Sequence, residues 1–174
     1  VSLANNLTFS PTPSFSVSTG GVFNPNTRTF TMNTGTFYAV SGSTISNSGL
    51  FQTQGTVTMI IRNGSNFNAP FKVNTGTTTS NDDGSPYIAD YKGSLTVDAG
   101  AILTTTGGGY SNRALGNATI NGTVSGNNFI VRGPSLINNG VINSSNFQFD
   151  STTSVTSTGV FSSSTIVVSA TGKP

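Results

Sequence analysis

Apolar and polar residues alternate along the last third of the chain in a pattern that recurs. The segments 118–131, 136–149 and 155–168 each read glycine, any residue, apolar, a polar gap, and then two apolar residues separated by one position. The glycines return at a nearly constant interval, and the apolar positions align with them: Gly122, Gly140 and Gly159; Val124, Ile142 and Phe161; Phe129, Phe147 and Ile166; Val131, Phe149 and Val168. A period near 20 residues is typical of repeat proteins.

This repeat predicts an all-β fold, a right-handed parallel β-helix (β-solenoid) with coils of about 18–20 residues. Thr, Val, Ile and Phe are plentiful and favour strands, whereas Gly and Asn supply turns. An antiparallel β-sandwich or jelly roll is the alternative, because Asn-Gly at 121–122 and 139–140 is also a strong hairpin signal. A sandwich does not require one pattern to return twice at nearly the same interval, so the solenoid is favoured.

Residues 1–22 differ from the rest, and we expect them to form an N-terminal arm or an edge or cap segment. LTF and FSVS in this stretch read as short strands on either side of Pro11 and Pro13, and proline is confined to sheet edges. We expect residues 23–174 to form a single solenoid domain. Two segments that break the pattern, 77–93 and 105–117, are predicted to be inserted loops.

The Gly-x-apolar repeats, rich in Asn, Gly, Ser and Thr, resemble the β-helical stalks of bacterial surface adhesins and filamentous-haemagglutinin-like proteins. The resemblance covers residues 94–174 well and the remainder loosely. It is a likeness of pattern, and it transfers no functional residue. It implies an extended, extracellular, non-enzymatic scaffold.

Composition narrows the classes of function. Only 7% of the residues are charged, against about 25% in a typical soluble protein, and the net charge is +2. No basic run is present, which disfavours nucleic acid as a partner. The absence of histidine and cysteine removes Ser-His-Asp and Cys-His catalysis and nearly all transition-metal sites. The apolar runs are shorter than the roughly 20 residues that span a membrane, and the abundance of small polar residues favours an extracellular or cell-surface location.

The remaining candidates for chemistry are oxygen and aromatic side chains. Asp82 and Asp83 in an Asn-Asp-Asp-Gly turn offer hard ligands for calcium, the single cofactor considered, although an ordinary Asx turn is the favoured explanation. Tyr87, Tyr91 and Tyr110 fall in the two predicted loops, where they either contact surface glycans or pack the loops onto the solenoid.

Paired carboxylates would be needed for a glycosidase. Besides the pair at 82–83, the candidates are Asp90, Asp98 and Asp150, and we expect Asp98 and Asp150 to face solvent at coil corners because their contexts match (TVDAG and QFDST). We expect no catalytic residue.

The last repeat ends at Val168 with no capping segment, and an uncovered coil exposes apolar residues and strand edges. Either the chain is cut from a longer stalk or its open end stacks on another copy, with the N-terminal arm adding a strand to the neighbour. The residues expected to form this head-to-tail contact are Phe9, Phe15, Phe161, Ile166 and Val168.

The first hypothesis is therefore a secreted structural protein, the subunit of an extracellular filament or adhesive stalk. The second is a carbohydrate-binding or polysaccharide-cleaving β-helix. A third, an ice-binding or surface-binding solenoid with threonine ladders, is disfavoured by the irregular spacing of Thr-x-Thr along the chain.

Overall fold

The computed structural model describes residues 1–10, 14–81, 89–106, 112–150 and 153–169. These residues contain no helix and form a single sheet of 20 strands that winds through about seven turns. Every strand pairing among them is parallel: each coil lies directly on the preceding one. The predicted β-solenoid is confirmed, and the antiparallel sandwich is excluded.

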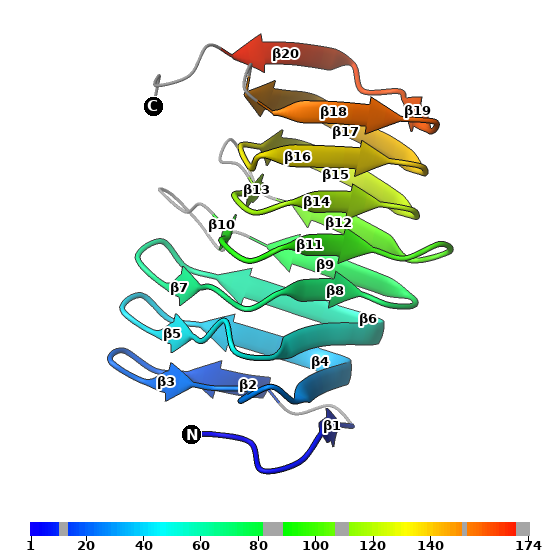
Figure 1. Ribbon diagram of the computed structural model, residues 1–174. Coiled ribbons are helices and arrows are strands. Elements are labelled where there is room, and N and C mark those ends of the chain that lie inside the picture. Colours follow the sequence, from blue (N-terminus) through cyan, green and yellow to red (C-terminus); the bar gives the residue numbers. More distant parts are fainter. Residues whose placement is uncertain (11–13, 82–88, 107–111, 151–152, 170–174) are drawn as a thin grey trace.

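Each turn of the solenoid contributes to three faces (Figure 1). Face 1 contains β1 (Leu7–Phe9), the first parts of β4 (Thr29–Ala39) and β6 (Leu50–Ile61), β8 (Phe71–Val73), β11 (Leu95–Val97), β14 (Ala118–Ile120), β16 (Ser135–Asn138) and β18 (Ser154–Ser157). Face 2 contains β2 (Ser14–Val17), the second parts of β4 and β6, β9 (Thr77–Asn81), β12 (Ile102–Thr106), the first parts of β15 (Thr123–Val131) and β17 (Val141–Asp150), and β19 (Val160–Phe161). Face 3 contains β3 (Val22–Phe23), β5 (Thr44–Ile45), β7 (Asn66–Phe67), β10 (Ala89–Tyr91), β13 (Asn112–Ala114), the second parts of β15 and β17, and β20 (Thr165–Ser169).

The winding of the chain can be followed in Figure 1. The strands of face 1 from β8 to β18 lie in front and point to the right, while β6, β9 and β12 of face 2 run to the left behind them. The chain climbs as it turns, from β1 at the bottom to β20 at the top. This combination makes the solenoid right-handed.

In the last three coils, the residues that align in the sequence repeat are the same residues that pair between neighbouring strands. Val124 pairs with Ile142, and Ile142 pairs with Phe161, as the pattern predicts. Earlier coils are longer than predicted, as the numbering of their pairs shows: Phe15 pairs with Phe37, and Thr78 pairs with Leu103. One additional residue lies within β6, where the register with β4 shifts between Met32 and Thr34, and the parallel pairing continues on both sides of the shift.

Residues 1–10 and 14–22 belong to the first coil of the solenoid. The two short strands predicted there are present, and β1 and β2 both pair with β4, while Ser2 forms a bridge with Asn24. In this structure the segment is the lower edge of the sheet and is bonded to its own chain.

The segment 77–93, predicted as a loop, contains two strands of the stack. β9 pairs with both β6 and β12, and β10 pairs with β7 and β13, while residues 82–88 lie outside the described residues. The polar character of TTTSN suggests a loop, but Thr78 and Ser80 point inward. Their hydroxyls are hydrogen-bonded inside the solenoid, so polar residues occupy core positions there. The predicted loop at 105–117 likewise overlaps strand ends, since β12 reaches Thr106 and β13 begins at Asn112.

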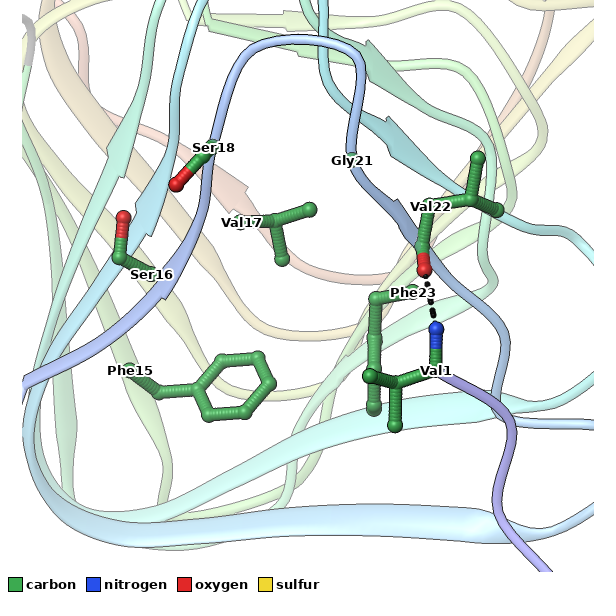
Figure 2. Close-up of a pocket in the computed structure, with 8 residues that line it drawn as sticks. All are labelled: Val1, Phe15, Ser16, Val17, Ser18, Gly21, Val22 and Phe23. Carbon is green, nitrogen blue, oxygen red and sulfur yellow. Dashed lines mark hydrogen bonds between the residues drawn. The ribbon is translucent and has the colours of Figure 1, made fainter.

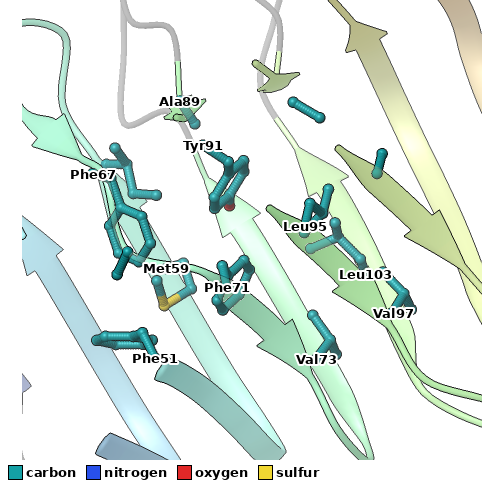
Figure 3. Close-up of a cluster of buried hydrophobic side chains, with 14 of the residues drawn as sticks. Phe51, Met59, Phe67, Phe71, Val73, Ala89, Tyr91, Leu95, Val97 and Leu103 are labelled. Carbon is teal, nitrogen blue, oxygen red and sulfur yellow. The ribbon is translucent and has the colours of Figure 1, made fainter. Parts of the chain in front are cut away.

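Aromatic side chains fill the lower half of the interior. Phe51 lies at the centre of this stack, with ring centroids 4.7 Å from Phe37, 5.0 Å from Phe30 and 5.3 Å from Phe67. Figure 3 shows how the stack passes through Phe71 and Tyr91 into smaller aliphatic residues above. All of these side chains are buried, so the interior provides a rigid support for the three outer faces.

Glycine marks the corner between faces 1 and 2 in the upper coils. A Cβ on Gly140 would lie 1.9 Å from the carbonyl oxygen of Gly122 in the coil below. The Asn-Gly pairs at 121–122 and 139–140, read as hairpin signals in the alternative fold, therefore permit close backbone stacking at a solenoid corner.

Candidate functional surfaces

Tyr91, predicted as a glycan contact, is buried in the core. Its ring stacks on Phe71 with centroids 5.0 Å apart, and its hydroxyl donates a 2.6 Å hydrogen bond to Ser80 Oγ. Ser80 Oγ in turn donates to Asn112 Oδ1 in the core. The prediction for Tyr91 is wrong, because its neighbours enclose it and its hydroxyl faces inward. Tyr87 and Tyr110 lie outside the described residues, so their role as glycan contacts stays a prediction.

The interior also changes the acid–base behaviour of Tyr91. Desolvation by burial raises the pKa of its phenol well above the ordinary value of 10.0, and the hydrogen bond with Ser80 opposes this only in part. The side chain is therefore neutral throughout the physiological range and acts as a structural hydrogen-bond donor.

Two of the candidate carboxylates are held in ion pairs. Arg113 donates to Asp90 from both Nε and Nη2 at 2.6 Å, and Lys72 Nζ lies 2.7 Å from Asp98 Oδ2. The first pair joins β10 to β13 on face 3, and the second joins β8 to the corner that follows β11. Both pairs tie one coil to another.

The candidate carboxylates do not converge in the described part of the chain. Asp98 begins the corner between faces 1 and 2, and Asp150 ends β17 at the corner between faces 3 and 1, so the matching sequence contexts occupy different corners. Asp82 and Asp83 lie outside the described residues, and their calcium site stays a prediction. Among the described residues, no group of three or more Asp, Glu, His or Cys residues is arranged to hold a metal ion.

The upper edge of the solenoid exposes the apolar columns of the repeat. Ile166 and Val168 in β20 pair with Phe147 and Phe149 below them, yet they are 49% and 59% exposed because no coil covers them in this structure. Phe161 in β19 is partly covered and stacks on Phe147 with centroids 5.4 Å apart.

The lower edge contains an apolar hollow of about 340 Å³ between β2 and β3. Figure 2 shows Phe15, Val17 and Phe23 around it, with the chain's first residue at one side, where the Val1 amino group donates a 2.7 Å hydrogen bond to the Val22 carbonyl. Phe9 and Phe15 are partly buried at this edge, with ring centroids 5.8 Å apart. Of the five residues predicted for assembly, the structure thus places two at the lower edge and three at the upper edge.

The third surface is the outer side of face 2, where the threonine pairs are aligned although their irregular spacing along the chain had argued against a repeated threonine face. Thr-x-Thr and related pairs occur at 34–36, 56–58, 77–79, 102–104 and 123–125, and the strand register places them above one another. The signal in the sequence was the recurrence of these pairs directly before or within predicted strands. Their unequal spacing concealed the alignment.

Comparisons of the chain with protein-family models, with curated proteins and with solved structures found no match. The described residues include no helix that is long and apolar enough to cross a membrane. The fold therefore stands on the structure itself, and function has to be argued from its surfaces.

Proposed function

We propose that the chain is a non-enzymatic structural unit of an extracellular filament or adhesive stalk, in which copies stack head to tail. The observation that carries this proposal is the exposure of Ile166 and Val168 at core positions of the upper coil. An edge of this kind is covered either by further coils of the same chain or by the first coil of another copy, and we propose the second.

The two edges offer matching surfaces. β18, β19 and β20 end faces 1, 2 and 3 at the top, while β1 and β2 begin faces 1 and 2 at the bottom, and residues 1–3 lie along the lower side of β3 on face 3. Because all strands run in the same sense within each face, stacking a second copy continues the parallel pairing. The apolar hollow bordered by Phe15 and Val22 at the lower edge then receives apolar side chains from β19 and β20. Such a contact joins two different surfaces and does not close on itself, so it produces a filament.

The low content of charge supports the same proposal. With 7% charged residues, few like charges face each other when identical subunits are stacked. The ion pairs of Asp90 and Asp98 lie on the sides of the solenoid, away from the stacking edges. Extracellular location follows from composition and from the resemblance to adhesin stalks.

Charge substitutions at the upper edge test the proposal. Ile166→Lys and Val168→Lys each place an ammonium group at a stacking position, whereas Val167→Lys places it on the outer side of the same strand, where Val167 is 37% exposed. Sedimentation velocity and negative-stain microscopy should show rods longer than one chain for the wild type and for V167K, and single particles for I166K and V168K.

A mixing experiment adds a test of polarity. I166K retains an intact lower edge, so it should bind the upper edge of a wild-type rod and stop its growth; small amounts should shorten wild-type rods. Wild-type chain that stays monomeric at high concentration, or a loss of rods in V167K equal to that in I166K, would overturn the proposal.

A further inference from the structure

The outer side of face 2 is a two-column array of threonine. Five successive coils contribute one residue to each column, in register from β4 through β6, β9, β12 and β15. The first column contains Thr34, Thr56, Thr77, Ile102 and Thr123, and the second contains Thr36, Thr58, Thr79, Thr104 and Ser125. Eight of the ten positions are therefore threonine, each presenting one hydroxyl and one methyl group outward.

Face 2 is uncharged, unlike its neighbours. None of its described strand segments contains Asp, Lys or Arg, whereas face 1 contains Lys72 and face 3 contains Asp90 and Arg113. On the other faces the long polar side chains bond to protein groups, as in the bond from Gln52 to Thr31 on face 1 and the ion pair of Asp90 with Arg113 on face 3.

Apart from Thr104, the threonine hydroxyls of the array have no protein hydrogen-bond partner among the described residues. Within the described residues, Thr36, Thr58 and Thr79 form no side-chain hydrogen bond to another protein group. The contact of Thr104 with Ser125 at 3.4 Å is long, and it is a bond between two members of the array. Partly exposed hydroxyls without a protein partner bind water, so the array fixes the positions of its first layer of water.

The array has two fixed periods. Successive coils are about 4.8 Å apart, and alternate residues of one strand are about 6.7 Å apart, so five coils cover about 19 Å. The spacing between coils is close to the shortest repeat of the oxygen lattice of hexagonal ice, and the spacing along a strand is somewhat shorter than the next repeat. The buried core beneath the strands, including Val57 and Met59, holds the array in place.

We propose that face 2 binds ice. Water bound to the hydroxyls and held between the methyl groups already has the two-dimensional order of the crystal, so joining the ice lattice costs little additional ordering. The lack of charge matters because a charged group orients water around itself and disrupts that order. Adsorption to ice goes beyond a structural role and is independent of end-to-end stacking.

Crystalline polysaccharide is the other rigid, uncharged surface to consider. Flat recognition of sugar rings relies on exposed aromatic side chains. Among the described outward-facing residues of face 2, Tyr38 is the single aromatic residue, and it lies beside the threonine columns. The array of small hydroxyl and methyl groups therefore favours ice.

Two substitutions and one matched control test the inference. Thr79→Tyr places a bulky ring at the centre of the array, and Thr56→Lys places a charge at one of its exposed positions. Thr96→Tyr is the same exchange as the first on face 1, at a partly exposed threonine that is in register with Lys72 and Thr119. Circular dichroism and urea unfolding establish that each variant is folded.

The readouts are the partition of protein into slowly growing ice and the shape of single ice crystals in protein solution. Wild type and T96Y should concentrate in the ice and facet the crystals, and T79Y and T56K should lose most of both effects. Measurement in the Ile166→Lys background separates this result from end-to-end assembly. Wild type that partitions no more than serum albumin overturns the inference, as does undiminished partition of folded T79Y and T56K. Binding to crystalline cellulose or chitin without partition into ice overturns it in favour of polysaccharide.

Discussion

In the hydrogen-bonded group of Ser80, Tyr91 and Asn112, two substitutions that each remove one hydroxyl should differ in their effect on stability. Ser80 Oγ accepts from the Tyr91 hydroxyl at 2.6 Å and donates to Asn112 Oδ1, and all three residues are at most 2% exposed. Tyr91→Phe removes one of the two bonds and leaves Ser80 bonded to Asn112. Ser80→Ala removes both bonds and leaves the phenol and the amide oxygen buried without a partner.

The loss of stability in each variant follows from the number of hydrogen bonds removed and the number of polar groups left buried without a partner. Losing one buried hydrogen bond costs about 1 kcal/mol, so Tyr91→Phe should lower the free energy of unfolding by about that amount. Each polar group left buried without a partner costs about 1–3 kcal/mol, so Ser80→Ala should cost about 3 kcal/mol or more. The space vacated by one hydroxyl is too small for a water molecule to replace it. Adding Tyr91→Phe to Ser80→Ala removes one unpaired group, so the double variant should be more stable than Ser80→Ala alone by roughly 1 kcal/mol.

Urea unfolding followed by circular dichroism measures all four proteins. Because a solenoid can lose coils separately, the comparison requires equal slopes with urea, so that midpoints report stability alone. Additive effects in the double variant, or a Ser80→Ala protein within about 0.5 kcal/mol of wild type, would refute the reasoning that Ser80 satisfies two buried groups.

Two further predictions concern pH and backbone stacking. The pKa of Tyr91 is raised in the folded state, so its contribution to stability is complete below the unfolded pKa of about 10 and declines as pH rises above it, by up to about 1.4 kcal/mol per pH unit. The difference in urea midpoint between wild type and Tyr91→Phe should therefore shift between about pH 9 and about pH 11. A difference that stays constant over this range would contradict the prediction. Gly140→Ala should lower the free energy of unfolding by about 3 kcal/mol or more, because the new Cβ would lie 1.9 Å from the Gly122 carbonyl oxygen. Gly100→Ala should lower it by about 1–2 kcal/mol, because Gly100 has φ 78° but no atom lies within 4 Å of the new Cβ. Thermal unfolding of the two alanine variants checks this order, and equal losses would argue against backbone contact at the corner.

The regular repeat explains why the fold of the upper coils was predictable. In the last three coils the apolar positions are in register on the sequence, and the structure pairs the same residues. In the lower coils the corners vary in length, so the sequence shows strands there without showing which residues are stacked. β9 was missed for another reason, because Thr78 and Ser80 are polar at inward positions, and their hydrogen-bond partners Thr53 and Tyr91 lie on other strands.

For the candidate sites too, the sequence predicted some positions, and contacts between strands decided others. The sequence predicted a loop at Tyr91 because Asp, Gly and Pro precede it. Its position is instead decided by ring contacts with Phe71 of β8 in the same coil and with Phe67 of β7 in the coil below. The structure places Phe161, Ile166 and Val168 at the upper edge and Phe9 and Phe15 at the lower edge, and their role as a contact stays a prediction.

The sequence by itself determined that this protein stacks β-strand coils around an apolar interior, because alternation and a near-constant period are local properties of the chain. Only the tertiary structure decided which outer residues form a common face. Thr58, Thr79 and Thr104 are unequally spaced along the chain, and their alignment depends on corner lengths that leave no regular mark in the sequence. Backbone hydrogen bonds between coils fix the register, so residues that look irregularly placed along the chain become neighbours at a single repeat distance of about 4.8 Å.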